Sequence, residues 1–250
     1  MQAAADYWRR LNMSKQVRRG FVPTDERDFG VKNIDKLRKA SEEVYFLLNR
    51  GYAVKPATTF VGNHYLLSER QRLALARTVS PEEKILLRKQ KELSDSDLAG
   101  KVLHIDGFNT IITLEIAFSD SMLFNCMDGT IRDLAGLRGT YRLVDKTDQA
   151  IQAISETLSE LNIQKAVFYL DAPVSNSGRL KERIAELMQN VPFELDIRIE
   201  NAVDYLLKLE SPVVTADAII LDECESWYNL TKKIIGEYPY IRLHEKEHNE

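Results

Sequence analysis

The spacing of hydrophobic and polar residues divides the chain into two parts. In residues 1 to about 95, apolar residues recur every three or four positions, which is the period of helices with one buried face. From about residue 100, short apolar runs alternate with helical patterns. A polar stretch with small residues, ELSDSDLAG at 92–100, separates the two parts and predicts a linker. We therefore predict a helical domain at residues 1–98 and an α/β domain at residues 99–250.

Capping residues mark the helices of the first part. Residues 1–22 predict a short basic helix, and Asn33 and Gly51 are expected to cap the two ends of a second one. Ser68 and Gln71 have the spacing of a capping box, which predicts a helix from there to about residue 78. The first part is therefore expected to be helical and basic.

The second part alternates strand and helix patterns. Strands are predicted at residues 102–106, 121–126, 166–170, 194–199, 217–221 and 240–243. Helices are predicted at residues 131–137, 148–161, 178–189, 201–209 and 226–235, and the apolar run at 110–118 suits either a strand or a buried helix. The alternation predicts an α/β fold in which helices cover a mostly parallel, Rossmann-like sheet, preceded by a smaller all-α basic domain.

The composition is that of an ordinary globular protein, with 44% hydrophobic and 29% charged residues among 250. No apolar run approaches the roughly 20 residues that span a bilayer, and the N-terminal residues lack the apolar centre of a signal peptide. The two cysteines, Cys126 and Cys224, do not make a disulfide framework. We expect a cytoplasmic protein with no membrane partner.

The charge is uneven along the chain. Residues 1–100 hold 19 Lys and Arg against 13 Asp and Glu, and the other 150 residues hold 15 against 25. A basic part is suited to a polyanion such as RNA, and an acidic part is suited to a metal ion. Attraction between the two parts of the chain explains the same asymmetry equally well.

Three predicted strands end in a carboxylate. Asp106 follows VLHI, Asp171 follows AVFYL and Asp222 follows AIIL. The carboxyl ends of parallel strands meet at one edge of a sheet, where ligands of open α/β sheets bind. Clustered carboxylates suit Mg²⁺ or Mn²⁺, which can activate a water and stabilise a leaving oxygen in phosphodiester cleavage. The alternative is that these acids cap loops or helix starts.

Other polar residues are candidates for the same site. Asn109 is positioned to orient a water or a phosphate, and Asp128 is a further candidate metal ligand. The strand–loop–helix pattern around Ser175, Asn176 and Ser177 is typical of loops that direct backbone N–H groups at an anion. An ordinary helix cap at Ser177 explains the same pattern.

Basic residues are candidates for contacts with substrate phosphates. In the second part they are Arg132, Arg138 and Arg142, beside glycines that permit close approach. In the first part, residues 60–65, FVGNHY, are expected to form a recognition loop that presents Asn63 and His64, with Arg70 following on the next helix. Structural ion pairs, a structural histidine and a solvated arginine face are the alternatives.

The motif Ile-Asp-Gly-Phe-Asn at 105–109 resembles the start of PIN-like nucleases of the NYN branch. The resemblance implies a parallel α/β sheet, an acidic Mg²⁺ or Mn²⁺ site and cleavage of RNA. Asp106 matches the first metal-binding Asp of the motif and Asn109 matches its Asn. By position along the chain, Asp171 and Asp222 are similar to the later acids at strand ends.

The whole chain also resembles a prokaryotic, largely archaeal family of two-part proteins of unknown function. The segment FVGNHYLLSERQRLAL at 60–75 is similar to the helical N-terminal domain of that family. The motifs IDGFN at 105–109 and DGTIRDLAGLRGTYR at 128–142 are similar to its C-terminal domain. This resemblance implies the two-domain arrangement and no particular activity.

Together these features predict a metal-dependent nuclease that hydrolyses phosphodiester bonds, with RNA favoured over DNA as its partner. Asp106, Asp171 and Asp222 are expected to hold the metal, with Asn109 beside them. A non-catalytic RNA- or nucleotide-binding module on the same fold is one alternative, and a phosphatase acting on small molecules is another. The sequence does not predict the oligomeric state.

Overall fold

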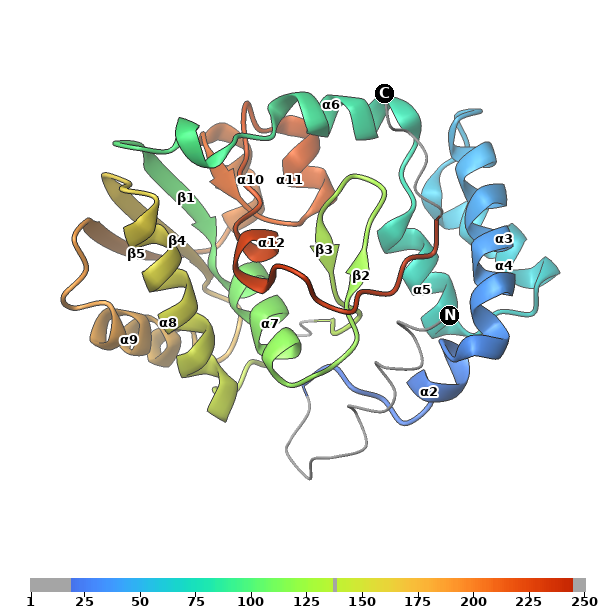
Figure 1. Cartoon of the computed structure of the whole chain (residues 1–250), viewed down its shortest axis with the longest axis horizontal. Helices are drawn as coiled ribbons and strands as arrows, with labels where there is room; N and C mark the ends of the chain where they lie inside the picture. The colour runs from blue at the N-terminus through green and yellow to red at the C-terminus, as the bar shows by residue number, and fades with distance from the viewer. Residues whose placement is uncertain (1–18, 137–138, 245–250) are drawn as a thin grey trace. The chain divides into compact units, whose positions relative to one another are not determined.

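A computed structural model describes residues 19–136 and 139–244 of the chain (Figure 1). The described residues form two compact units. The first comprises residues 19–89, 119–135 and 237–244, and the second comprises residues 90–118, 136 and 139–236. The chain therefore leaves the first unit twice and returns to it twice. The basic helix predicted at residues 1–22 lies, except for its last four residues, outside the described part.

The first unit is built from helices and one short hairpin. Its helices are α2 (Asp25–Asp28), α3 (Val31–Leu48), α4 (Val54–His64), α5 (Glu69–Thr78) and most of α6 (Glu82–Lys91). The hairpin pairs β2 (Phe124–Asn125) with β3 (Ile131–Arg132) in antiparallel fashion. Leu37 and Val44 of α3, Val61 of α4 and Leu75 of α5 are fully buried in one core with Phe124 of the hairpin. The apolar residues that recur at helical spacing in the sequence are thus the ones that form this core.

Two expectations for the first unit are wrong and one is confirmed. Residues 60–65 are not a loop, because the last five residues of α4 run from Phe60 to His64. Asn33 does not cap α3, which begins two residues earlier after Gly30. The capping box at Ser68 is confirmed: its side chain accepts a hydrogen bond from the Gln71 N–H, and the Gln71 side chain accepts one from the Ser68 N–H.

The second unit contains a parallel sheet. Its strands β1 (Val102–Asp106), β4 (Lys165–Asp171), β5 (Glu194–Glu200) and β6 (Val213–Val214) lie in the order β5-β4-β1-β6, and every pair is parallel. Between and around them lie η1 (Asp95–Asp97), α7 (Gly107–Phe118), α8 (Asp145–Glu160), α9 (Ser177–Leu187), α10 (Val203–Leu209), α11 (Ala218–Glu223) and α12 (Leu230–Ile235) (Figure 1). The predicted α/β class with a mostly parallel sheet is confirmed, and the ambiguous run at 110–118 is helical.

Helices cover both faces of this sheet. Side chains alternate between faces along a strand. Leu170 of β4 packs toward the start of α7, whereas Tyr169 lies in a buried cluster with Val203 and Leu207 of α10. Helix α8 packs on α7 and α9, and α11 packs on α10. The layers leave the carboxyl ends of β1, β4 and β6 at one edge, where the candidate acids were expected.

Two predicted elements of the α/β part are wrong, a third is shorter than predicted, and a fourth is reduced to a single bridge. Residues 217–221 are not a strand, because α11 occupies residues 218–223 and the fourth strand, β6, precedes it. Residues 131–137 begin with β3 rather than forming a helix. Strand 121–126 shortens to β2, and the region 240–243 contributes only an isolated bridge between Ile241 and Phe124. Most apolar residues of these segments are buried, but outside the central sheet, and Ile219 is 60% exposed.

Gly107 allows α7 to approach β4 closely. A Cβ atom at this position would lie 2.6 Å from Cδ2 of Leu170 and 3.0 Å from the carbonyl oxygen of Tyr169. We expect Gly107→Ala to lower the free energy of unfolding by about 1–3 kcal/mol, because overpacking displaces the helix from the strand. Chemical denaturation of both proteins measures this difference. Gly178→Ala is the control, since a Cβ there meets nothing within 4 Å, and equal losses in the two variants would contradict the prediction.

Candidate functional site

Asp106 is the last residue of β1 and lies at the floor of the carboxyl edge. Its residue surface is only 6% exposed. The Thr215 hydroxyl donates a hydrogen bond to its Oδ2 at 2.9 Å, and the Asn109 N–H donates to its Oδ1 at 3.3 Å. Burial raises the pKa of Asp106 to about 7, even though these two hydrogen bonds lower it, and the negative charges of Asp217 and Asp171 raise it further. Ionising Asp106 in this environment therefore costs free energy, and a bound cation would reduce that cost.

Three more acids share this electrostatic environment. Asp171 ends β4, and burial together with the charge of Asp204 raises its pKa. Burial and the charge of Asp217 raise the pKa of Asp204, which lies in the first turn of α10. Each of the four acids is thus in the field of at least two of the others. We name Asp106, Asp171, Asp204 and Asp217 the acid ring.

The acid ring lies where the order of the strands reverses. From β1 the chain proceeds to β4 and β5 on one side, and β6 then lies on the other side of β1. In open parallel sheets, the crevice outside such a reversal is the usual position of a ligand. Asp106 ends β1, and Asp217 follows β6 by three residues, so these two acids flank the reversal.

Asp217 has a second role as the N-cap of α11. Its Oδ1 accepts hydrogen bonds from the N–H groups of Ile219 and Ile220, at 2.8 and 3.3 Å. This cap fixes the direction of the side chain and leaves Oδ2 for other contacts. As the described residues stand, no three acidic, histidine or cysteine side chains are close enough together to hold one metal ion.

Sequence reasoning missed Asp204 and Asp217. Asp217 was hidden because β6 has two residues, so VVTAD does not resemble a full strand ending in an acid. Asp204 follows the start of a helix rather than the end of a strand. The expected position of Asp222 at a strand end is wrong: it lies in α11, where its backbone oxygen accepts a hydrogen bond from Lys91 at 2.9 Å.

Asn109 joins the two strands beside the reversal. Its Oδ1 accepts a hydrogen bond from the Ala216 N–H at 2.9 Å, while its own N–H donates to Asp106. Thr215 completes this connection, because its hydroxyl donates to Asp106 and accepts from the Asp217 N–H at 3.0 Å. Asn109 and Thr215 therefore fix the positions of two acids of the ring.

The side chains of Ser175, Asn176 and Ser177 bind backbone groups. The Ser175 hydroxyl oxygen accepts a hydrogen bond from the Tyr141 N–H at 3.2 Å, and the Asn176 amide donates to the Tyr141 carbonyl oxygen at 2.6 Å. The Ser177 hydroxyl donates to the carbonyl oxygen of Asp171 at 2.6 Å. These contacts hold the loop after β4 against the segment that carries Arg142, which is exposed.

Asp128 and Arg132 lie in the first unit and bind each other. Oδ2 of Asp128 accepts hydrogen bonds from Arg132 and from Arg88, each at 2.6 Å, and the Asp128 side chain is fully buried. The expectation that Asp128 holds metal with Asp106 has no support in this arrangement, because two guanidinium groups already bind it. Arg138 lies outside the described residues.

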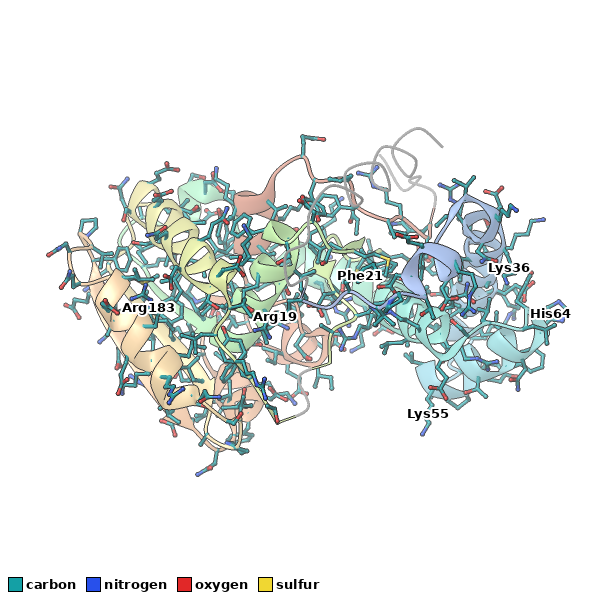
Figure 2. The ribbon with its side chains drawn as sticks, turned by 90° about the horizontal axis from the view of Figure 1, so that it is seen from below. Arg19, Phe21, Lys36, Lys55, His64 and Arg183 are labelled. Atoms are coloured by element: carbon teal, nitrogen blue, oxygen red, sulfur yellow. The ribbon has the colours of Figure 1, made fainter. Side chains whose placement is uncertain are left out.

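The candidate residues of the helical part have structural partners. Arg70 forms an ion pair with the buried Asp25 and donates to the carbonyl oxygen of Leu134. The Asn63 side chain accepts a hydrogen bond from Arg72 at 2.9 Å. His64 is exposed at the end of α4, and Figure 2 shows it pointing outward from the first unit. Asn63 and His64 are both exposed, so their surface positions agree with a recognition role, and the Asn63 side chain also binds Arg72.

The comparisons with known proteins identify relatives of unknown function. Residues 95–233 match the family model described as "Domain of unknown function (DUF5616)", and residues 36–91 match that of "Protein of unknown function (DUF434)". The chain is 39% identical over 185 residues to uncharacterized protein MJ0935 of Methanocaldococcus jannaschii, covering 74% of this chain and 88% of the relative. No solved structure matches the chain. None of the described helices is both long enough and apolar enough to cross a membrane.

Proposed function

The chain belongs to the DUF5616 family, whose function is unknown, and from the acid ring we propose that the protein is a metal-dependent hydrolase of phosphodiester bonds on a PIN-like fold. One observation carries the proposal. Four carboxylates influence one another at the carboxyl edge of a parallel sheet, beside the reversal of its strand order. The resemblance of residues 105–109 to NYN nucleases favours RNA over DNA as the substrate.

The acid ring offers the ligand type of a hard divalent cation, although as the described residues stand no three of its carboxylates are close enough to share one. The ring offers carboxylate oxygens, which are the preferred ligands of Mg²⁺ and Mn²⁺. Burial raises the pKa values of Asp106, Asp171 and Asp204, neighbouring carboxylates raise them further, and a cation among the acids would oppose both effects. When bound, the ion would supply an activated water and stabilise the charge of the leaving oxygen.

The remaining side chains at the edge take supporting roles in this proposal. Asp106, Asp171, Asp204 and Asp217 hold the ion. Asn109 and Thr215 position the acids on either side of the strand reversal. Arg142 contacts substrate phosphate, since it lies exposed on a segment that is hydrogen-bonded to the loop following Asp171.

The experiment adds metal to the purified protein and follows both binding and cleavage. We expect wild type to bind Mn²⁺ in a calorimetric titration and to cleave end-labelled RNA, with EDTA abolishing the cleavage. Asp106→Asn is expected to lose Mn²⁺ binding. The proposal is wrong if wild type binds Mn²⁺ no better than Asp106→Asn and leaves RNA intact at all metal concentrations.

A non-catalytic RNA-binding module is the second candidate. The observation that favours it is the spacing of the acids, since no three described side chains are close enough to share an ion as they stand. A binding module would retain RNA in EDTA and lose it steeply with added salt. A small-molecule phosphatase would instead hydrolyse p-nitrophenyl phosphate and ignore RNA in the same samples.

A further inference from the structure

We propose that the edge strand β5 joins two copies of the chain, by pairing antiparallel with β5 of a second copy about a two-fold axis at Ile197. β5 is the last strand in the order β5-β4-β1-β6, and β4 is the only strand beside it among the described residues (Figure 1). Its other edge therefore carries a row of backbone N–H and C=O groups that a further strand can bind. Such pairing would be independent of the proposed hydrolase activity.

The hydrogen bonds of β5 with β4 show which residues face the open edge. The Glu194 N–H donates to the Gln164 carbonyl oxygen at 3.0 Å, and the Glu200 carbonyl oxygen accepts from the Ala172 N–H at 2.8 Å. The even-numbered residues of β5 therefore bind β4, because successive residues of a strand direct their backbone groups to opposite sides. The residues whose backbone groups point outward are Leu195, Ile197 and Ile199. In the described part of the chain, nothing hydrogen-bonds to these outward groups.

A two-fold axis at Ile197 satisfies this outward row. Ile197 then lies opposite Ile197 of the second copy, and Leu195 lies opposite Ile199. Since all of these residues face outward, each opposed pair among them exchanges two backbone hydrogen bonds. The side chain of Ile199, which is 37% exposed, would be covered by Leu195 of the second copy. The two four-stranded sheets would thus continue through the contact as one sheet.

The charged side chains of β5 complement one another in this register. Asp196 and Arg198 project from the same face of the sheet, are 34% and 43% exposed, and bind each other at 2.9 Å. The two-fold axis places Asp196 opposite Arg198 of the second copy, and Arg198 opposite Asp196. These are non-hydrogen-bonded pairs, in which opposed side chains approach most closely. Two ion pairs across the contact therefore favour this register.

Neighbouring contacts hold Arg198 in position and limit the repulsion at the ends of the strand pair. The Arg198 guanidinium donates to the Tyr169 hydroxyl at 3.3 Å and lies over the Tyr169 ring, 5.5 Å from its centre. Because the side chain is already held, it loses less conformational entropy on pairing. The register also places Glu194 opposite Glu200 of the second copy, but Glu194 is paired with Lys165 at 3.6 Å. Like charges thus meet only at the ends, beside a lysine.

The test measures the mass of the full chain by sedimentation equilibrium over a range of concentrations. Asp196→Arg leaves β5 with two positive charges on this face, and Arg198→Asp leaves it with two negative charges. Each variant therefore opposes like charges to its own copy, whereas a mixture of the two opposes unlike charges. Asp35→Arg is the matched control, because Asp35 also pairs with an arginine at the surface and lies in the first unit. Circular dichroism of each variant verifies folding.

We expect wild type to dimerise with a micromolar dissociation constant, since a contact of one strand pair is small. Asp196→Arg and Arg198→Asp should each raise this constant at least about tenfold, because two attractions become two repulsions. An equimolar mixture of the two variants should regain the wild-type constant, which misfolding of either variant could not produce. Asp35→Arg should leave the constant unchanged.

Three results would overturn the proposal. A wild-type chain that stays monomeric at every concentration would mean that the charges of β5 protect the edge from pairing instead. A dimer that persists unchanged in both Asp196→Arg and Arg198→Asp would place the contact on another surface. A mixture of the two variants that stays monomeric while wild type dimerises would exclude the two-fold pairing of Asp196 with Arg198.

Discussion

Replacing Asp128 with alanine is expected to lower the free energy of unfolding of the first unit by about 3–5 kcal/mol. The Asp128 carboxylate accepts hydrogen bonds from Arg88 and Arg132 through one oxygen, and from the Thr130 hydroxyl at 2.6 Å through the other. The side chains of Arg88 and Arg132 are 4% and 8% exposed. Removing the carboxylate leaves two buried positive charges facing each other, so the cost exceeds that of losing the hydrogen bonds alone.

The same network predicts how stability depends on pH. Burial raises the pKa of Asp128, but the charges of Arg132 and Arg88 and the hydrogen bonds lower it to about 2, below the ordinary value of 3.8. A group with a lowered pKa in the folded state stabilises the fold above the pKa of the unfolded state. This stabilisation is therefore complete above about pH 4 and is lost as pH falls toward about 2.

Urea titration of wild type and of Asp128→Ala, followed by circular dichroism at pH 7 and at pH 3, measures both effects. Asp35→Ala is the control, because Asp35 pairs with Arg38 at the surface and its side chain is 84% exposed. We expect the control to change stability by less than about 1 kcal/mol. Similar losses in the two variants, or a loss in Asp128→Ala that is as large at pH 3 as at pH 7, would contradict this account of the network.

The buried network around Asp128 also explains why the interpretation of residues 128–142 as a phosphate-binding segment was wrong for Asp128 and Arg132. DGTIRDLAGLRGTYR combines acids, arginines and glycines, which is the composition of a phosphate-binding segment as well as of a buried ion-pair network. The sequence does not reveal which of these groups become buried together. Arg88 precedes Asp128 by 40 residues and lies in a different element. A local sequence pattern does not predict a partner at that distance.

The parallel sheet was predictable where strands are long. β1, β4 and β5 each carry five to seven residues with apolar side chains on at least one face, and their predicted bounds differ from the observed ones by at most one residue. β6 has two residues, so its apolar signal merges with that of α11. The run AIIL is buried on one side of a helix, and four apolar residues are too few to distinguish the period of a helix from that of a strand.

This confusion has a chemical consequence. Placing the fourth strand at residues 217–221 made Asp222 the last candidate acid, whereas the acid that follows β6 at the carboxyl edge is Asp217. The remaining two acids at strand ends, Asp106 and Asp171, were located from sequence because long apolar runs precede them. The rule that acids follow parallel strands therefore predicted the correct edge of the sheet. The error in one strand made Asp222 a candidate in place of Asp217, which lies five residues earlier.

The exchange of Asp222 for Asp217 makes the sharpest test of the site. We expect Asp217→Asn to lower the rate of metal-dependent RNA cleavage by about 100- to 10,000-fold, the loss that follows if several kcal/mol of transition-state stabilisation by the ion disappear. Asparagine retains an oxygen that can cap α11 through Ile219 and Ile220, so the fold should persist. The substitution removes the charge that acts on Asp106 and Asp204.

Asp222→Asn is the matched control, because it changes the same functional group five residues away on the same helix. Its interaction with Lys91 uses the backbone oxygen, which the substitution preserves. We expect its cleavage rate to remain within about twofold of wild type, since it leaves the charges of the acid ring unchanged. Cleavage is measured on end-labelled RNA under single-turnover conditions with saturating Mn²⁺. A larger loss in Asp222→Asn than in Asp217→Asn would contradict the placement of the catalytic site at the acid ring.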